Sequence, residues 1–233
     1  MILNSFFRAV AQIGDPRFRR VLFLGIGLSF ALLVVFYAGF LWLLSALFGD
    51  EVTVPLVGEV AWLNDLLTWG SFGVMLLLSV FLMLPVASAI TSMFLEDVAQ
   101  AVEDRHYPHL PPATMVPFGD AVRDTINFLG LLIGANVLAL LLYVFFPPFS
   151  PFIFWGMNGY LLGREYFTLA AMRRVGREGA RTMLRQNVGR VWIAGILMAM
   201  PLSVPLVNLL IPILGAATFT HLFHQIQSRA PSG

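Results

Sequence analysis

The sequence predicts an all-α integral membrane protein with two long transmembrane helices, two re-entrant helical hairpins that cross only half of the bilayer, and amphipathic surface helices. Hydrophobic residues make up 58% of the chain and charged residues 12%, whereas globular domains contain about 25% charged residues. Four long stretches carry no charge, and two of them contain three prolines each. No linker or change in composition separates parts of the chain, so we expect one membrane domain over residues 1–233.

Two charge-free stretches, residues 21–49 and 66–95, are the predicted transmembrane helices. A helix needs about 20 residues to cross about 30 Å of hydrocarbon, and these stretches contain 29 and 30 uncharged residues. The first is too long for the apolar region of a secretory signal, which has about 7 to 15 residues. We therefore expect it to remain in the protein as a span.

Prolines interrupt the other two apolar stretches, residues 125–163 and 191–220. They are Pro147, Pro148 and Pro151 in the first stretch and Pro201, Pro205 and Pro212 in the second. Proline removes a backbone donor and clashes with the preceding helical turn. We therefore expect one helix to end near Phe146, and short arms over 152–163 and 191–200 that reach only part of the way across the bilayer.

The distribution of charge predicts which segments face the cytoplasm. Residues 1–20 contain four arginines and one acid, residues 164–190 contain seven arginines and two glutamates, and residues 50–65 contain four acids and no base. Basic residues accumulate on the cytoplasmic side, so an even number of crossings should separate the two basic segments. Two spans and a re-entrant hairpin satisfy this rule, as would four spans with one very short helix. Residues 96–124, with mixed charge and several prolines, are expected to form a solvated connection of irregular backbone.

A possible anion site lies where the first long helix begins. Asp15 favours the position before a helix and Pro16 favours its first position, which leaves the amides of residues 17–19 without helical acceptors at the positive end of the helix dipole. Arg19 and Arg20 add guanidinium groups suited to tetrahedral oxyanions. The alternative is that Asp15 caps these amides itself while the arginines contact phospholipid headgroups.

A second basic feature is a repeat of arginines every four residues. Its members are Arg173, Arg177, Arg181 and Arg185, with Arg174 and Arg190 beside them. On one continuous helix this spacing forms a single cationic face. Such a face would either lie against anionic lipid or act as an electrostatic funnel for an anion pathway.

The remaining polar and small residues predict packing rather than chemistry. Glycines spaced by four residues, at 130–134 and 159–163, allow close approach of helices. His221 and His224 are expected near the membrane interface rather than at a metal. The chain contains no cysteine, and it shows no nucleophile–base pattern and no phosphate-binding loop. We therefore expect no enzymatic activity, no cofactor, no metal and no nucleic-acid partner.

The chain resembles the CysZ family of bacterial sulfate permeases, and four segments carry the resemblance. They are residues 6–10, 15–21, 205–212 and 215–218. In that family a Gly-Leu-Arg-Arg type motif at the start of the first long helix is associated with sulfate binding. The resemblance places Phe18 at the leucine position and Arg19 and Arg20 at the arginine positions, while Arg17 stands where the family has glycine. It therefore implies a sulfate site made of these four residues.

The resemblance also implies a function and partners. It implies a sulfate permease of the bacterial inner membrane that supplies sulfate for cysteine synthesis. Its implied partners are membrane lipids and further copies of the chain, in a homo-oligomer whose neighbouring protomers can be oppositely oriented. Since the sequence contains no nucleotide-binding element, transport would be channel-like or coupled to an ion gradient. The alternatives are a membrane scaffold or lipid-interacting protein, and a permease for another oxyanion such as sulfite, thiosulfate or molybdate.

Overall fold

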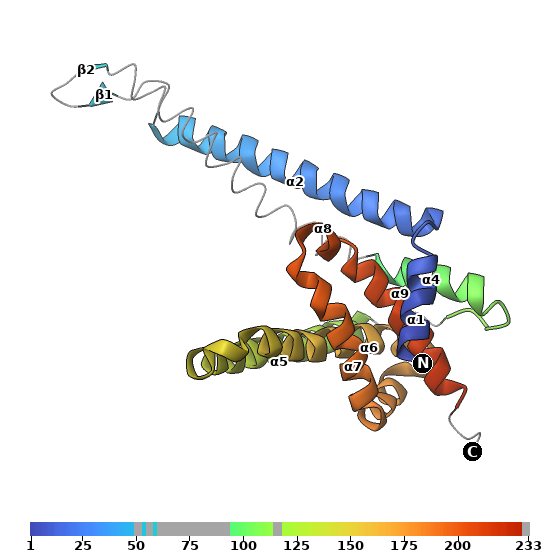
Figure 1. The fold of residues 1–233 in the computed structure, drawn as a ribbon. Coiled ribbons are helices and arrows are strands. Elements are labelled where there is room, and N and C mark those ends of the chain that lie inside the picture. The colour runs from blue at the N-terminus through green and yellow to red at the C-terminus, as the bar shows by residue number, and fades with distance from the viewer. Residues whose placement is uncertain (49–52, 55–57, 60–93, 114–117, 230–233) are drawn as a thin grey trace. The chain divides into compact units, whose positions relative to one another are not determined.

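The computed structural model describes most of the chain (Figure 1). The described residues are 1–48, 53–54, 58–59, 94–113 and 118–229. The chain divides into two compact units, one made of residues 1–22 and 92–233 and the other of residues 23–91. The regular elements among the described residues are helices, apart from a short antiparallel ladder in which β1 (Thr53–Val54) pairs with β2 (Gly58–Glu59). The helical fold class expected from the sequence is confirmed.

The long helix α2 (Pro16–Phe48) contains the first predicted span and continues from the first unit into the second. It begins at Pro16, as the sequence predicted, because proline needs no hydrogen-bond acceptor at a helix start. Within it, Pro16–Gly39 is apolar and long enough, at 24 residues, to cross a membrane. The second predicted span, residues 66–95, lies almost entirely outside the described residues.

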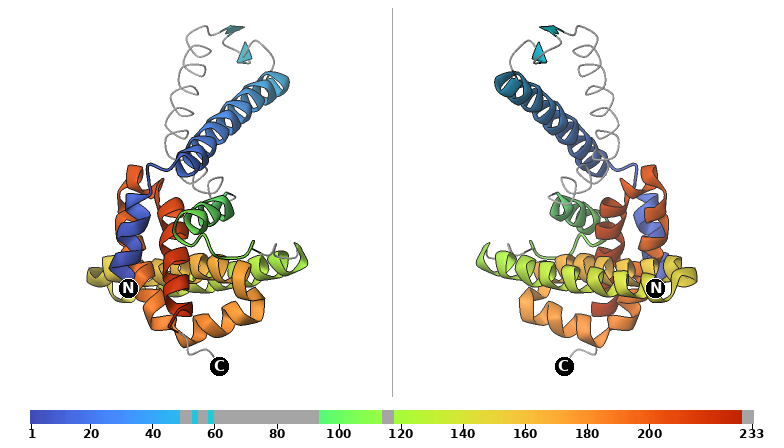
Figure 2. Two further views of the ribbon diagram at one scale, coloured as in Figure 1. Left: turned by 90° about the vertical axis from the view of Figure 1, so that its right-hand side faces the viewer. Right: turned by 90° about the vertical axis from the view of Figure 1, so that its left-hand side faces the viewer.

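The helix α9 (Ile211–Gln227) forms the core of the first unit. Its residues from Ile211 to His224 are all buried, and a helix that is buried on every side belongs to the centre of a bundle. The helices α1 (Ile2–Ala11), α4 (Leu95–His106) and α6 (Ser150–Gln186) pack around it (Figure 1; Figure 2). Buried apolar residues of α1, α4 and α6 belong with those of α9 to one hydrophobic core.

The expectation of a solvated loop over residues 96–124 is wrong, because α4 lies inside it. Its residues Leu95, Val98 and Val102 are at most 2% exposed and belong to the core. Apolar residues at 95, 98, 99 and 102 follow the spacing of one helix face, and this pattern could have revealed the helix. The acid Glu103 on the same helix is buried as well.

The prolines of the third apolar stretch break the chain where expected. The helix α5 (Phe118–Phe145) is followed by the 3-10 turn η1 (Pro147–Phe149), and α6 then begins beside Pro151. The expected end of the second helix at Gly163 is wrong, because α6 continues to Gln186. A Cβ atom at Gly163 would lie 2.6 Å from the carbonyl oxygen of Val191, so this glycine serves close packing and does not end the helix.

The fourth apolar stretch folds as α7 (Val188–Ala199), the 3-10 turn η2 (Met200–Ser203), α8 (Pro205–Asn208) and α9. Its prolines stand in η2 or in the first turns of α8 and α9, where proline is tolerated. The predicted interruption is confirmed, while the depth of either helix pair in a bilayer stays a prediction. By length and composition, the 20 residues Ile126–Phe145 of α5 could also cross a membrane.

Candidate anion-binding site

Asp15 caps the start of α2. Its Oδ1 accepts a hydrogen bond from the amide of Arg17 at 2.9 Å, and its carbonyl oxygen accepts one from the amide of Arg19 at 3.0 Å. Its Oδ2 lies 3.1 Å from Nε2 of Gln12 and 3.8 Å from the guanidinium of Arg105. The aspartate therefore occupies helix-start amides itself, which is the alternative that the sequence left open.

The four residues of the expected sulfate site have different surroundings. Phe18 is buried, at 1% exposure, so neither its ring nor its backbone is open to a dissolved ligand. The guanidinium of Arg17 lies 2.5 Å from Oδ2 of Asp104 on α4, and this hydrogen bond lowers the pKa of the aspartate. The side chains of Arg19 and Arg20 are exposed. They are the guanidinium groups at the helix start that remain open to a ligand.

A buried cluster of charged side chains lies behind this helix start, and sequence reasoning missed it. Glu103 on α4 is 2% exposed. Its two oxygens accept hydrogen bonds from Arg174 on α6, at 2.9 Å from Nε and 2.7 Å from Nη2. Nη1 of Arg173 lies 3.5 Å from the same carboxylate, and Nε2 of His224 on α9 lies 3.0 Å from it. The cluster thus ties three helices together.

The positive groups around Glu103 keep it ionised. Burial by itself would raise the pKa of this carboxyl, because a charge is costly in a low-dielectric interior. The hydrogen bonds with His224 and Arg174 and the charge of Arg173 outweigh burial and lower the pKa to about 2. The carboxylate therefore stays negative at every physiological pH and holds both arginines in place.

Hydrogen bonds connect the buried cluster to the helix start. Nη2 of Arg173 donates to Oε1 of Gln100 at 2.5 Å, and Nε2 of Gln100 donates to Oδ1 of Asp104 at 2.7 Å. Asp104 in turn pairs with Arg17. One turn of α4, ending in the neighbours Glu103 and Asp104, therefore positions the first turn of α2 relative to α6.

The two histidines of α9 are buried among the helices, while their expected position near the membrane interface stays a prediction. His221 and His224 are 0% and 6% exposed, because α9 is the central helix. Nδ1 of His221 lies 3.1 Å from the hydroxyl of Tyr107, whose ring stacks against His224 at a centroid distance of 4.2 Å. Burial lowers the pKa of His221 to about 3, so it is neutral at physiological pH. No group of metal-ligating side chains occurs among the described residues.

The arginine repeat on α6 does not form one cationic face, which corrects the geometric expectation. Gly176 has φ 68° and ψ −179°, a conformation open only to glycine, and it kinks the helix between the first and second arginines of the repeat. Arg173, before the kink, is 7% exposed and belongs to the buried cluster. Arg177, beside the kink, is half-buried, while Arg181 and Arg185 beyond it are exposed. The buried member cannot contribute to a surface funnel.

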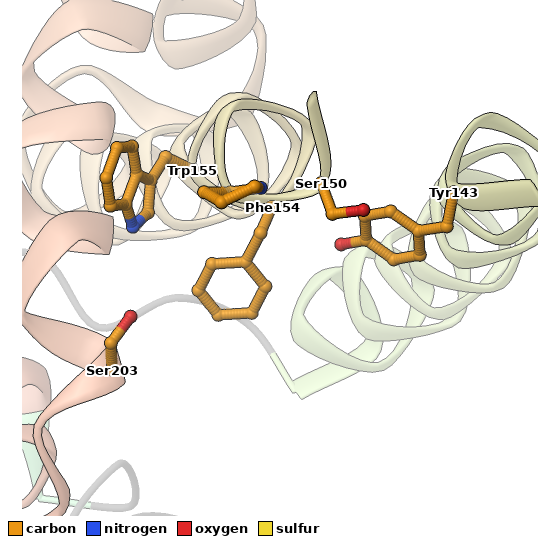
Figure 3. A pocket seen from close by; sticks show the side chains of 6 residues that line it. Tyr143, Ser150, Phe154, Trp155 and Ser203 are labelled. Carbon is orange, nitrogen blue, oxygen red and sulfur yellow. The ribbon is translucent and has the colours of Figure 1, made fainter. Parts of the chain in front are cut away.

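A pocket of about 470 Å³ lies near the turn between α5 and α6 (Figure 3). Its walls come from α5, from the start of α6 and from η2, and its lining residues are Tyr143, Ser150, Pro151, Phe154, Trp155 and Ser203. Within the described part of the chain, the lining side chains are uncharged. The pocket therefore lacks the guanidinium groups that the start of α2 offers to an anion.

A comparison with protein families agrees with the resemblance noted from the sequence. The model of the family described as sulfate transporter CysZ/etoposide-induced protein 2.4 matches residues 5–212. Among curated proteins, none matches the chain. The match covers the helix start of α2, the whole of α6 and the beginning of α9, and with the two long apolar helices it indicates a membrane protein. The chain belongs to this sulfate transporter family.

Proposed function

We propose that this protein carries sulfate across the bacterial inner membrane as a multi-pass permease that supplies cysteine synthesis, and that Arg19 and Arg20 make the first contact with the anion. One observation carries the choice of these residues. In the described part of the chain, neither guanidinium has an ion-pair partner, whereas the neighbouring Arg17 is neutralised by Asp104. The family match supports sulfate as the transported anion.

The chemistry of the helix start suits a tetrahedral dianion. Each guanidinium can donate two parallel hydrogen bonds to an oxyanion, so Arg19 and Arg20 together can match the two negative charges of sulfate. Both side chains are exposed, so bound sulfate would stay partly hydrated and be held weakly. Weak binding fits a transport pathway, because a permeating ion must leave its site as readily as it enters.

Arg17 and Phe18 support the site in this proposal. Phe18 fixes the first turn of α2 by its buried ring, and the pair of Arg17 with Asp104 fixes the same turn to α4. Both contacts reduce the motion of the turn that carries the two exposed arginines. Transport itself would be channel-like or coupled to an ion gradient, and independent of ATP.

Sulfate flux into liposomes tests the proposed site. Phosphatidylcholine vesicles that contain the protein should take up radiolabelled sulfate. At sulfate concentrations below saturation, the double variant R19Q/R20Q should lower the initial rate of uptake at least tenfold, since a hydrogen bond to a charged group contributes about 1.5 to 3 kcal/mol. The variant R181Q/R185Q removes the same charge from another exposed surface and should keep the original rate.

Two results would count against the proposal. Equal flux through R19Q/R20Q and the original chain would remove the assigned site while leaving the substrate open. Absence of sulfate flux in the original chain, with flux of sulfite, thiosulfate or molybdate, would instead change the substrate. A competition series with these anions on the same vesicles separates the two cases.

A further inference from the structure

We propose that the corner between α6 and α7 is a binding surface for anionic phospholipid headgroups. The surface consists of Arg181 and Arg185 on α6 and Arg190 and Trp192 on α7. None of these residues belongs to the start of α2, so the surface goes beyond the proposed sulfate site. Two independent features of these residues, one electrostatic and one apolar, point to a lipid rather than to a dissolved anion.

The electrostatic feature is the end of α6 beyond the kink at Gly176. Ala180 is buried and Met183 and Leu184 pack against the core, so this segment has an apolar inner side. Its outer side carries Arg181 and Arg185, which are exposed. The apolar inner side holds this segment against the protein, so its two exposed arginines keep a defined position from which they can attract anionic headgroups.

The apolar feature is the exposed side of α7. Val188 and Trp192, one helical turn apart, are each 45% exposed, and Ile193 is 60% exposed. Val191 and Ala194 on the opposite side are buried. An exposed row of large apolar side chains directly after a cationic segment is the arrangement found at the boundary between headgroups and acyl chains.

The ring of Trp192 is partly exposed, and its one polar group is hydrogen-bonded within the protein. Its indole N–H donates to the carbonyl oxygen of Gly156 at 2.8 Å. The one polar group of the side chain is therefore satisfied by the protein, and the ring can enter an apolar environment without losing a hydrogen bond. A tryptophan fixed in this way is suited to act as an anchor in the membrane.

Asn187 joins the two features at a single corner. Its amide group donates to the carbonyl oxygen of Met183 at the end of α6, and its Oδ1 accepts a hydrogen bond from Nη1 of Arg190 at 3.1 Å. Arg190 is thereby turned towards the end of α6 that carries the other two arginines. From this corner the 12 residues of α7 extend about 18 Å, roughly half of the hydrocarbon thickness.

Titration of purified full-length protein with phospholipid tests this proposal. Bound phosphatidylglycerol and phosphatidylcholine are counted by native mass spectrometry. In R181Q/R185Q we expect phosphatidylglycerol to bind about thirty-fold more weakly, from the usual contribution of two basic side chains near an anionic surface, with phosphatidylcholine unchanged. R181K/R185K keeps the charge and should retain binding, as should R19Q/R20Q, which removes the same charge elsewhere.

Depth measurement provides a second readout. The chain has no cysteine, so a fluorophore on I193C labels one position, and a nitroxide attached high on a phospholipid acyl chain should quench it strongly. The same label on T182C, exposed on α6, should be quenched weakly. Equal quenching at both positions would overturn the assigned boundary.

The lipid surface and the sulfate site can fail separately. Unchanged phosphatidylglycerol binding in R181Q/R185Q would refute the lipid surface and leave the sulfate site untouched. A loss of sulfate flux in R181Q/R185Q in vesicles of phosphatidylcholine alone would refute it too, because the arginines would then act on the dissolved anion. Loss of flux in R19Q/R20Q concerns the sulfate site alone.

Discussion

Replacement of Glu103 by glutamine should destabilise the protein more than replacement of any exposed acid. The carboxylate is 2% exposed, and the side chains of Arg173 and Arg174 that face it are each 8% exposed. Glutamine keeps the size of the side chain but removes the charge, so both guanidiniums stay buried without the carboxylate that faces them. Removal of one partner from a buried ion pair costs about 3 to 5 kcal/mol.

The pair of Arg17 with Asp104 is the matched control for this variant. Asp104 is the next residue on the same helix, but its side chain is 46% exposed and that of Arg17 is 55% exposed. Exposed pairs contribute about 0 to 1 kcal/mol, since water screens both charges. D104N should therefore change the stability of the protein little, although the two acids are neighbours in sequence.

Thermal unfolding in detergent distinguishes the two variants. A change of 1 kcal/mol moves the midpoint of a chain of this length by about 2 to 4 °C, so E103Q should lower it by about 6 to 20 °C and D104N by less than about 4 °C. R174Q combined with E103Q should cost less than the sum of the single variants, because each removes the same contact. A midpoint for E103Q within 2 °C of that for D104N would refute the account of the buried cluster.

Two further predictions concern packing and pH. G195A should lower the unfolding midpoint markedly, because the new Cβ would lie 1.8 Å from the carbonyl oxygen of Gly159. In G134A the new Cβ has no atom within 4 Å, so the midpoint should be unchanged or slightly higher. Equal midpoints for the two variants would show that the contact between α6 and α7 can relax. Because burial depresses the pKa of His221 to about 3, from about 6.5 in the unfolded chain, its stabilising contribution is present above pH 6.5 and declines as the pH falls towards 3. Lowering the pH from 7 to 5 should thus reduce the free energy of unfolding by about 2 kcal/mol. H221Q should lose this part of the pH dependence of stability. If stability depends on pH as steeply in H221Q as in the original chain, another group causes the dependence.

Local sequence patterns predicted some of the helix boundaries. The start of α2 at Pro16 and the end of α5 before the prolines of η1 depend on the chemistry of single residues and their neighbours, so they could be predicted from the sequence. The helix α4 could have been found in the same way, from its apolar spacing. The end of α6 could not be predicted, since Gly163 and Gly176 look alike in sequence. Only the packing of Gly163 against Val191 and the dihedral angles of Gly176 show that the first allows close helix contact and the second kinks the helix.

The candidate site was predictable in part. The sequence by itself determined that arginines gather at the start of a long apolar helix, because capping signals and charge act over a few neighbouring residues. Only the tertiary structure decided which arginines are open to a ligand. Arg17 pairs with an acid 87 positions away and Arg174 with one 71 positions away, and such partners are set by how α4, α6 and α9 pack, which no local pattern encodes.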